Sequence, residues 1–228
     1  MPHKTTTFSG DDLQRMYRAR FKGRLEYRHK VWKVLVRDYF QQYVRSADTI
    51  LDLGAGYGEF INNIQCKKKY AMDLNPDTAE KIDADVELFA RDSSMRWPLP
   101  DESLDVVFTS NFFEHLVNKE ALDFTLREAR RCLVPGGSLI ALGPNITYCG
   151  DAYWQVVDHH VALSDQSLSE AMRHAGFTIH TCIGTFLPFT MSEGLQYPTF
   201  VVAAYLRFPL AWRIFGKQFL VIGKNSSV

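Results

Sequence analysis

Apolar and polar positions follow two different periods along most of the chain. Seven short stretches have the apolar runs or the alternation of β-strands: residues 49–53, 69–74, 86–90, 104–110, 138–143, 177–183 and 218–223. Between them, the pattern predicts helices from about residue 58, after 75–76, over 118–132 and near 166–175, and it predicts a turn at 134–137. Strands that alternate with helices in this way favour an α/β fold with a mostly parallel sheet.

The region before the first strand has a helical pattern of its own. Residues 11–45 are predicted as one helix, because Asp11 and Asp12 suit its start and apolar side chains such as Val31 and Leu35 recur at helical spacing. We therefore divide the chain into an N-terminal helical cap, residues 1–47, and a main domain, residues 48–228.

The predicted cap is strongly basic over part of its length. From Arg15 to Arg37 it holds nine Lys or Arg and one acidic residue. One interpretation is a solvated helix face. The other is a lid on which Tyr17 and Phe21 close over a site, and one of its arginines grips an anionic ligand. The candidate arginines are Arg20, Arg24 and Arg28.

An aromatic insertion, residues 185–216, precedes the last predicted strand. Its apolar part is too short and too interrupted to span a bilayer. We keep three hypotheses for it: a cover for a ligand pocket or a homodimer interface, a peripheral membrane contact with Arg207 and Arg213 at the headgroups, or ordinary core.

Composition narrows the class of protein. With 228 residues, 46% of them hydrophobic and 23% charged, the chain fits one globular α/β unit. Its formal net charge is zero, so no nucleic-acid partner is expected. The four cysteines are far apart and predict neither a zinc site nor a disulfide framework. No secretory signal is recognisable, and we expect a cytoplasmic protein.

Three glycines at alternate positions follow the first predicted strand in the stretch "ILDLGAGYGEF", residues 50–60. Glycines between a strand and a helix expose backbone N–H groups and let a nucleotide-like ligand approach closely. The dinucleotide fingerprint needs a small residue where this chain has Glu59, which weakens an NAD-binding interpretation. Asp73 ends the next strand, where a carboxylate can accept hydrogen bonds from ribose hydroxyls.

Three segments together resemble a known family. They are Asp52 with Gly54, Gly56 and Gly58, the run "ARDSSMRWPLPDESLDVVFTSNFFEHL" at 90–116, and "EARRCLVPGGSLIA" at 128–141. In this order they resemble the class I S-adenosylmethionine-dependent methyltransferases of type 11, over roughly residues 48–183. The resemblance implies a Rossmann-like fold with a seven-stranded, mostly parallel sheet whose last strand is antiparallel. It also implies S-adenosyl-L-methionine as the cofactor.

The same resemblance assigns the cofactor contacts. Asp52 would orient the methionine amino group, and Asp92 would face the adenine amino group. The full set of cofactor-binding residues that it implies is Asp52, Gly54, Ala55, Gly56, Asp73, Leu74, Asp92, Ser93, Ser110, Asn111 and His115.

A candidate general base lies after the fifth predicted strand, in the segment that caps the acceptor pocket in this family. His159 is preferred, with Asp158 to raise its basicity, and His160 is the alternative, because neighbours in an extended segment face opposite ways. Both histidines could instead be ordinary loop residues. Asp158 and His160 share a face but have no evident third ligand, so we predict no metal site. Tyr148, Tyr153 and Trp154 are candidates for an aromatic wall.

The sequence thus predicts an enzyme that transfers a methyl group, most readily to a hydroxyl oxygen. Tails like this one occur in methyltransferases of bacterial polysaccharide and glycoconjugate pathways, so the expected acceptor is a sugar or glycan hydroxyl or another small molecule, with a phosphate group as an option. The alternatives are an NAD-dependent oxidoreductase and a non-catalytic cofactor-binding module.

Overall fold

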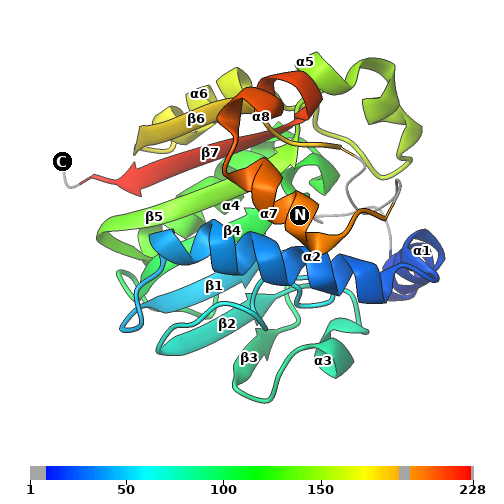
Figure 1. Ribbon diagram of the computed structural model, residues 1–228. Coiled ribbons are helices and arrows are strands. Elements are labelled where there is room, and N and C mark those ends of the chain that lie inside the picture. The colour runs from blue at the N-terminus through cyan, green and yellow to red at the C-terminus, as the bar shows by residue number, and fades with distance from the viewer. Residues whose placement is uncertain (1–8, 190–195, 227–228) are drawn as a thin grey trace.

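The computed structural model describes residues 9–189 and 196–226 and places a seven-stranded sheet at its centre (Figure 1). The strands are β1 (Thr49–Leu53), β2 (Lys68–Met72), β3 (Val86–Phe89), β4 (Leu104–Ser110), β5 (Leu133–Pro144), β6 (Phe177–Leu187) and β7 (Gln218–Asn225). Their order in the sheet is β3-β2-β1-β4-β5-β7-β6. Strand β7 runs antiparallel to both of its neighbours, β5 and β6, whereas the other neighbouring strands of this sheet pair in parallel. The predicted α/β fold is confirmed.

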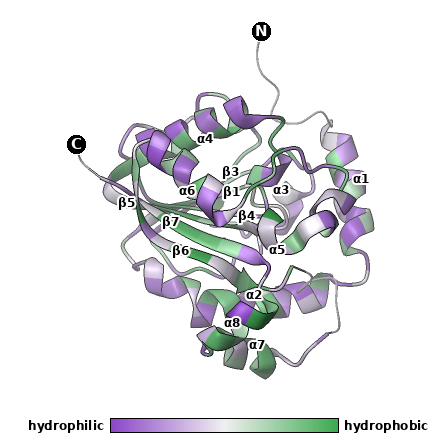
Figure 2. Cartoon of the chain, turned by 90° about the horizontal axis from the view of Figure 1, so that it is seen from above, coloured by the Kyte–Doolittle hydropathy of each residue, from purple (hydrophilic) through white to green (hydrophobic). Residues whose placement is uncertain are grey.

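Helices cover both faces of the sheet. They are α1 (Gly10–Phe21), α2 (Leu25–Asp38), α3 (Thr78–Lys81), α4 (Lys119–Cys132), α5 (Ile146–Cys149), α6 (Asp165–His174), α7 (Thr199–Leu206) and α8 (Pro209–Phe215), with 3-10 turns at Phe40–Tyr43, Phe113–His115 and Gly150–Gln155. Seen from above, α4 and α6 lie on one face, and α2, α7 and α8 lie on the other (Figure 2). Helices α1 and α5 lie near the end of the sheet where β1 and β4 finish.

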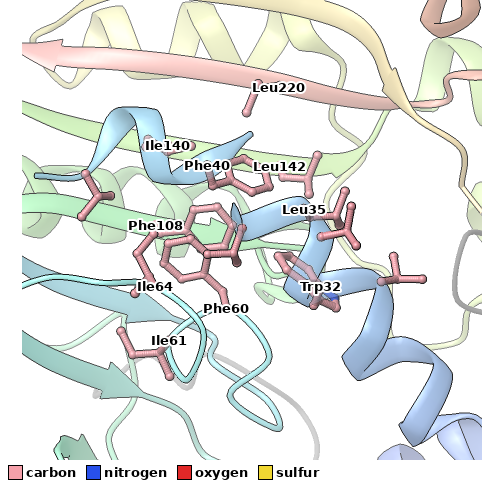
Figure 3. Packing of buried hydrophobic residues seen from close by; sticks show 14 of the residues in the cluster. Trp32, Leu35, Phe40, Phe60, Ile61, Ile64, Phe108, Ile140, Leu142 and Leu220 are labelled. Atoms are coloured by element: carbon pink, nitrogen blue, oxygen red, sulfur yellow. The ribbon is translucent and has the colours of Figure 1, made fainter. Parts of the chain in front are cut away.

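Neighbouring residues of the central strands point into two separate cores, as the pleat of a strand requires. Ile50 and Phe108 pack under α2, whereas Leu51 and Val107 pack under α4 and α6. In the first core, the rings of Phe60 and Phe108 stack with centroids 3.6 Å apart (Figure 3). Burial on both faces explains why these strands read as continuous apolar runs.

Three local predictions were wrong. The single helix over 11–45 is interrupted between α1 and α2, where Gly23 adopts a φ of +74°. The helix expected from about residue 58 is a series of turns with two helical bonds, from Asn62 N–H to the Gly58 carbonyl at 3.0 Å and from Ile64 N–H to the Phe60 carbonyl at 3.1 Å. The stretch 134–137 is no free turn but an irregular part of β5, where the register with β4 shifts.

Helix α1 is fixed to the main domain by polar contacts. Its first turn is closed by a capping box between Ser9 and Asp12. From its body, Gln14 and Arg18 donate hydrogen bonds to the carboxylate of Asp77 at 2.7 and 2.8 Å. Because Asp77 follows β2, these bonds hold α1 beside the carboxyl ends of the strands.

The described part of the aromatic insertion belongs to the α2 side of the molecule. Helix α7 packs against α2, and α8 packs against β6. Tyr205 donates from its hydroxyl to the Phe186 carbonyl at 2.7 Å, and the indole N–H of Trp212 donates to the Tyr205 carbonyl at 2.9 Å. One side of the insertion is therefore core, while residues 190–195 lie outside the described part of the chain. The division between a cap and a main domain at residue 47 stays a prediction.

Candidate active site

The turn after β1 depends on glycines in the left-handed region. Gly54, Gly56 and Gly58 have φ values of +72°, +55° and +74°, which residues with a Cβ rarely adopt. A Cβ on Gly54 would lie 2.5 Å from the ring of Phe112, and one on Gly56 would lie 3.2 Å from the ring of Tyr17. The turn therefore has no room for side chains at its first two glycines.

Asp73 holds this turn from the end of β2. Its Oδ2 accepts the N–H of Gly56 at 2.7 Å, and its Oδ1 accepts the N–H of Asn75 at 2.7 Å. Burial raises the pKa of Asp73, and these backbone donors oppose the rise. A carboxylate has about four acceptor sites, so Asp73 can accept ligand hydroxyls in addition.

Two further carboxylates lie near this turn. Burial raises the pKa of Asp52 well above its ordinary value, and the charges of Glu59 and Asp73 raise it further. Glu59 is ion-paired with Arg28, and both side chains are mostly buried. Carboxylates that repel one another in a buried place are stabilised by a positively charged group, so this end of the site favours a cationic ligand.

Two adjoining cavities lie at the carboxyl ends of the strands, and we name each by one lining residue. The Asp73 cavity is lined by Leu13, Tyr17, Leu53, Met72, Asp73, Leu74, Asn75, Arg91, Ser93, Phe112, His115 and Asp158. The His159 cavity is lined by Tyr17, Arg20, Phe21, Arg28, Trp32, Asp52, Gly54, Ala55, Gly56, Glu59, Phe60, Phe108, Ser110, Asn111, Glu114, His115, Val156, His159, Phe189 and Gln218. Tyr17 and His115 belong to both walls.

Ten of the eleven residues assigned to the cofactor line one or both cavities. The exception is Asp92, whose Oδ1 accepts the N–H and the hydroxyl of Ser94 at 2.8 and 2.7 Å. Its neighbours Arg91 and Ser93 do line the Asp73 cavity. Direct contact of Asp92 with adenine therefore stays a prediction.

The histidine segment is arranged differently from the expectation. Asp158 does not pair with His159. Its Oδ2 lies 3.1 Å from Nδ1 of His115, and its Oδ1 accepts a hydrogen bond from Arg20 at 2.7 Å. His159 instead places Nδ1 2.7 Å from the Tyr153 carbonyl. Because a carbonyl only accepts, Nδ1 of His159 carries the hydrogen, and Nε2 keeps its lone pair.

The charges of this group follow from burial and from the Asp158 contacts. Burial, followed by the charge of His115, lowers the pKa of His159 to about 4, so its ring is neutral and weakly basic near pH 7. Burial alone would lower the pKa of His115, but the hydrogen bond to Asp158 and the charge of Glu114 outweigh it and raise that pKa. Burial also raises the pKa of Glu114.

The basic helix lies where the lid interpretation requires, and closure over a ligand stays a prediction. Tyr17, Phe21 and Arg20 line the His159 cavity from α1, and Arg28 lines it from α2. Both arginines are already paired, with Asp158 and Glu59 respectively. Arg24 is not among the residues that line either cavity.

Other expectations for this region were wrong. Neither cavity is lined by Tyr148, Tyr153, Trp154 or His160. Tyr153 is fully buried and packs on His159 with ring centroids 4.6 Å apart. Three other residues of the cavity walls, Phe112, Glu114 and Gln218, were not predicted. Glu114 stands within the "EHL" match, which was the one signal that could have found it.

The comparisons with known proteins agree with this geometry. Residues 51–141 match the family described as "Methyltransferase domain". A crystal structure of an S-adenosylmethionine-dependent methyltransferase from Archaeoglobus fulgidus superposes with a TM-score of 0.67 and 21% identity, over 92% of this chain and 98% of that one. Residues 51–141 thus match a methyltransferase domain, and the described part of the chain has the fold of the class I, S-adenosylmethionine-dependent methyltransferases.

Two curated relatives match part of this methyltransferase domain. The 27-O-demethylrifamycin SV methyltransferase of Amycolatopsis mediterranei is 33% identical over 112 residues, which is 44% of this chain. An uncharacterized methyltransferase-like protein of Schizosaccharomyces pombe is 38% identical over 96 residues, or 40% of the chain. The matches span only 39% and 36% of the length of these relatives.

A third similar structure holds a partner protein. It is the complex between the Haloferax volcanii Trm112 methyltransferase activator and a methyltransferase, with a TM-score of 0.66 and 20% identity over 97% of this chain and 99% of that one. At this identity the likeness shows the fold of the domain.

The residues of the methyltransferase domain fit the cofactor. The turn at Gly54 and Gly56 has no side chains, so a ligand can lie close to its backbone. Asp73 can accept further hydrogen bonds, as ribose hydroxyls require. The neighbouring carboxylates of Asp52, Glu59 and Asp73 favour a cationic ligand. The NAD interpretation is not favoured, because Glu59 fills the position of the fingerprint's last small residue and the comparisons name methyltransferases. Within residues 9–189 and 196–226, no helix is long and apolar enough to cross a membrane.

Proposed function

We propose that this domain transfers a methyl group from S-adenosylmethionine to a hydroxyl oxygen of a small molecule, with a sugar or glycan hydroxyl as the expected kind of acceptor. The observation that carries the proposal is that two cavities adjoin across Tyr17 and His115. The Asp73 cavity contains the carboxylate expected to bind the ribose, and the His159 cavity has polar groups suited to a second ligand. The relative from Amycolatopsis mediterranei, named for a 27-O-demethyl substrate, supports an oxygen acceptor.

When bound, S-adenosylmethionine supplies an electrophilic methyl carbon on a positively charged sulfur. Asp73 would accept hydrogen bonds from the ribose hydroxyls, and Asp52 would accept hydrogen bonds from the methionine ammonium group. Helix α1 would exclude water, because Tyr17 covers the glycine turn. The acceptor oxygen must lie in line with the carbon–sulfur bond and must lose its proton, since the new O–C bond forms as the C–S electron pair returns to sulfur.

The wall of the His159 cavity suggests how an acceptor is held. Gln218 is 6% exposed, and its amide N–H donates to the Pro188 carbonyl at 3.0 Å, whereas its buried Oε1 has no hydrogen-bond partner in the structure. A donor on the acceptor would satisfy that oxygen. Arg20 and Arg28 would meet an acceptor that carries a phosphate or carboxylate, once each arginine shares its present carboxylate partner.

The cofactor part is tested by thermal unfolding with S-adenosylhomocysteine, S-adenosylmethionine and NAD in parallel. A ligand at about 100 times its dissociation constant stabilises by about 2.7 kcal/mol, or roughly 5–10 °C for a domain of this size. We expect a shift with the two sulfur compounds and none with NAD. A shift with NAD alone would reject the proposal. Methylation of hydroxylated acceptors is then followed as release of S-adenosylhomocysteine, and binding without any turnover would favour a non-catalytic module.

The outer face of α7 and α8 supports a peripheral contact with an anionic membrane surface. Its exposed apolar residues are Phe200, Phe208, Leu210, Ile214 and Phe215, which are 60–74% exposed. Arg207 and Arg213 are exposed among them, and residues 196–226 contain no acidic residue. Figure 2 shows this strongly hydrophobic pair of helices at the edge of the molecule. Apolar side chains interspersed with arginines suit anionic headgroups better than they suit a second basic copy of the same face.

The test is co-sedimentation with phosphatidylserine vesicles and with phosphatidylcholine vesicles at low salt. We expect binding to the anionic vesicles, and loss of it when Phe208 and Ile214 are both changed to Ser. Val157→Ser is the matched control, because Val157 is 76% exposed but lies in another segment. No vesicle binding, together with a dimer that the double variant abolishes, would show that this face joins two copies instead.

A further inference from the structure

We propose that Glu114, His115 and His159 form a site for a divalent transition-metal ion at the wall of the His159 cavity. The chain brings together two residues of the turn after β4 and one residue 44 positions later. One ligand atom from each of the three lies within 4.8 Å of the others. Two imidazoles and one carboxylate form a set that binds Zn²⁺ and related ions while leaving coordination positions open.

Both histidines make the hydrogen bonds from Nδ1 that are typical of metal-binding histidines. His159 donates from Nδ1 to the Tyr153 carbonyl at 2.7 Å. His115 donates from Nδ1 to the Asp158 carbonyl at 2.9 Å, with Asp158 Oδ2 3.1 Å away. Each Nε2 therefore keeps a lone pair that can bind an ion. Ligating histidines almost always donate their other ring N–H to a carbonyl or carboxylate, which fixes the ring.

The carboxylate is the most buried member of the three. Glu114 is 1% exposed, and its Oε1 lies 4.0 Å from Nε2 of His115. Arg20 on α1 donates its hydrogen bond to Oδ1 of Asp158, at an N···O distance of 2.7 Å. Metal–ligand distances of about 2.0–2.2 Å require ligand atoms about 3–3.5 Å apart, so the separations between the ligand atoms need to shorten by up to about 1.5 Å. A cation between them would stabilise the buried carboxylate.

The site would act on the acceptor, and this role rests on the proposed methyl transfer. A hydroxyl bound to the ion's open position would lose its proton to water more easily. The resulting oxygen would attack the methyl carbon while the C–S electron pair returns to sulfur, giving a methyl ether, S-adenosylhomocysteine and one released proton. Neutral His159 would then act as a ligand in place of the general base expected from the sequence.

Binding is measured directly on the full chain. After removal of metal by a chelator, Zn²⁺, Mn²⁺ and Mg²⁺ are titrated by calorimetry, and Co²⁺ by its visible spectrum. We expect one Zn²⁺ or Co²⁺ per chain, with affinity lowered more than about 100-fold in Glu114→Gln and in His159→Gln, and about 10- to 100-fold in Asp158→Asn. His180→Ala is the control for exposed histidines and should bind as the unchanged protein does.

Two results would overturn the site: no stoichiometric binding of any of these ions, or variants that bind as tightly as the unchanged chain. In either case the three residues would belong to a hydrogen-bonded network with Asp158 and Arg20. Binding of S-adenosylhomocysteine by Glu114→Gln and His159→Gln, within about threefold of the parent, checks that these two variants fold. Asp158 lines the Asp73 cavity, so thermal unfolding is the check for Asp158→Asn. The metal site and the proposed methyl transfer are tested independently. Ion binding is measured without turnover, and cofactor binding is measured without metal.

Discussion

The Asp73 cavity and the His159 cavity share Tyr17 and His115 but are assembled in different ways. The first is built mainly from the ends of β1 and β2 and from the turns that follow β2, β3 and β4. The second also includes the glycine turn after β1, and it adds side chains from α1, α2, the turn after β4, the segment around His159 and the start of β7. Backbone and local motifs therefore determine the cofactor groups in both cavities, whereas long-range packing determines the acceptor groups of the His159 cavity.

The largest effect is expected where the cofactor side depends on backbone. Gly54→Ala should lower the affinity for S-adenosylhomocysteine at least about 100-fold, because the new Cβ meets the Phe112 ring at 2.5 Å and the φ of +72° is strained. Gly136→Ala is a matched control, since Gly136 has a similar φ of +80° but nothing within 4 Å of the new atom. It should cost about 1 kcal/mol of unfolding free energy and leave affinity unchanged. Equal loss of affinity in both would refute the clash.

A similar loss, in turnover instead of binding, is expected on the acceptor side. His159→Ala should reduce kcat at least about 100-fold, the scale of a general base or of an acceptor-activating ligand. The affinity for S-adenosylhomocysteine should stay within about threefold, because the groups assigned to the cofactor remain. Steady-state kinetics measures kcat, and calorimetry on the same preparation measures the affinity for S-adenosylhomocysteine. Unchanged turnover would remove His159 from the chemistry under either role.

A smaller effect is expected at Asp77, where α1 is docked on the main domain. Asp77→Asn should weaken the docking of α1 by about 1–2 kcal/mol, because the charged carboxylate accepts from Arg18 and Gln14. Hydrogen exchange of residues 10–21 should rise, and both cavities should lose affinity together. Faster exchange without any loss of affinity would show that α1 is no lid.

The same contact has a pH dependence. The hydrogen bonds from Arg18, with help from Gln14, lower the pKa of Asp77 to about 2 from an ordinary value of 3.8. A carboxyl group whose pKa is lower in the folded than in the unfolded state stabilises the folded state at pH values above the unfolded pKa. The contribution of Asp77 to the unfolding free energy is therefore complete above about pH 4, and it fades as the pH falls toward 2. The difference in unfolding free energy between parent and Asp77→Asn should shrink over that window.

The smallest effect is expected at Trp154. Its side chain is 55% exposed and lines neither cavity, so Trp154→Ala should change KM for the acceptor by less than about twofold. Trp32→Ala is the contrast, because Trp32 lines the His159 cavity and is 7% exposed. A large rise in KM for Trp154→Ala would show that the acceptor reaches beyond the cavity.

The different assembly of the two cavities also explains which parts could be predicted from sequence. The strands were predictable because burial on both faces makes them continuous apolar runs, and Gly54 and Asp73 because a local motif places them at strand ends. The partner of Asp158 was not predictable, because Arg20 and His115 reach it from 138 and 43 residues away. The break at Gly23 was also missed, since one glycine does not outweigh a helical pattern that continues on both sides.

Helix α1 has a kinetic consequence. Tyr17 lies in the walls of both cavities, and Arg18 and Arg20 on the same helix are bonded to Asp77 and Asp158. We expect both ligands to exchange when this helix lifts, so that the departure of both products becomes one opening event. The rate at which α1 lifts would then set an upper limit on the number of turnovers per second, however fast the methyl group is transferred.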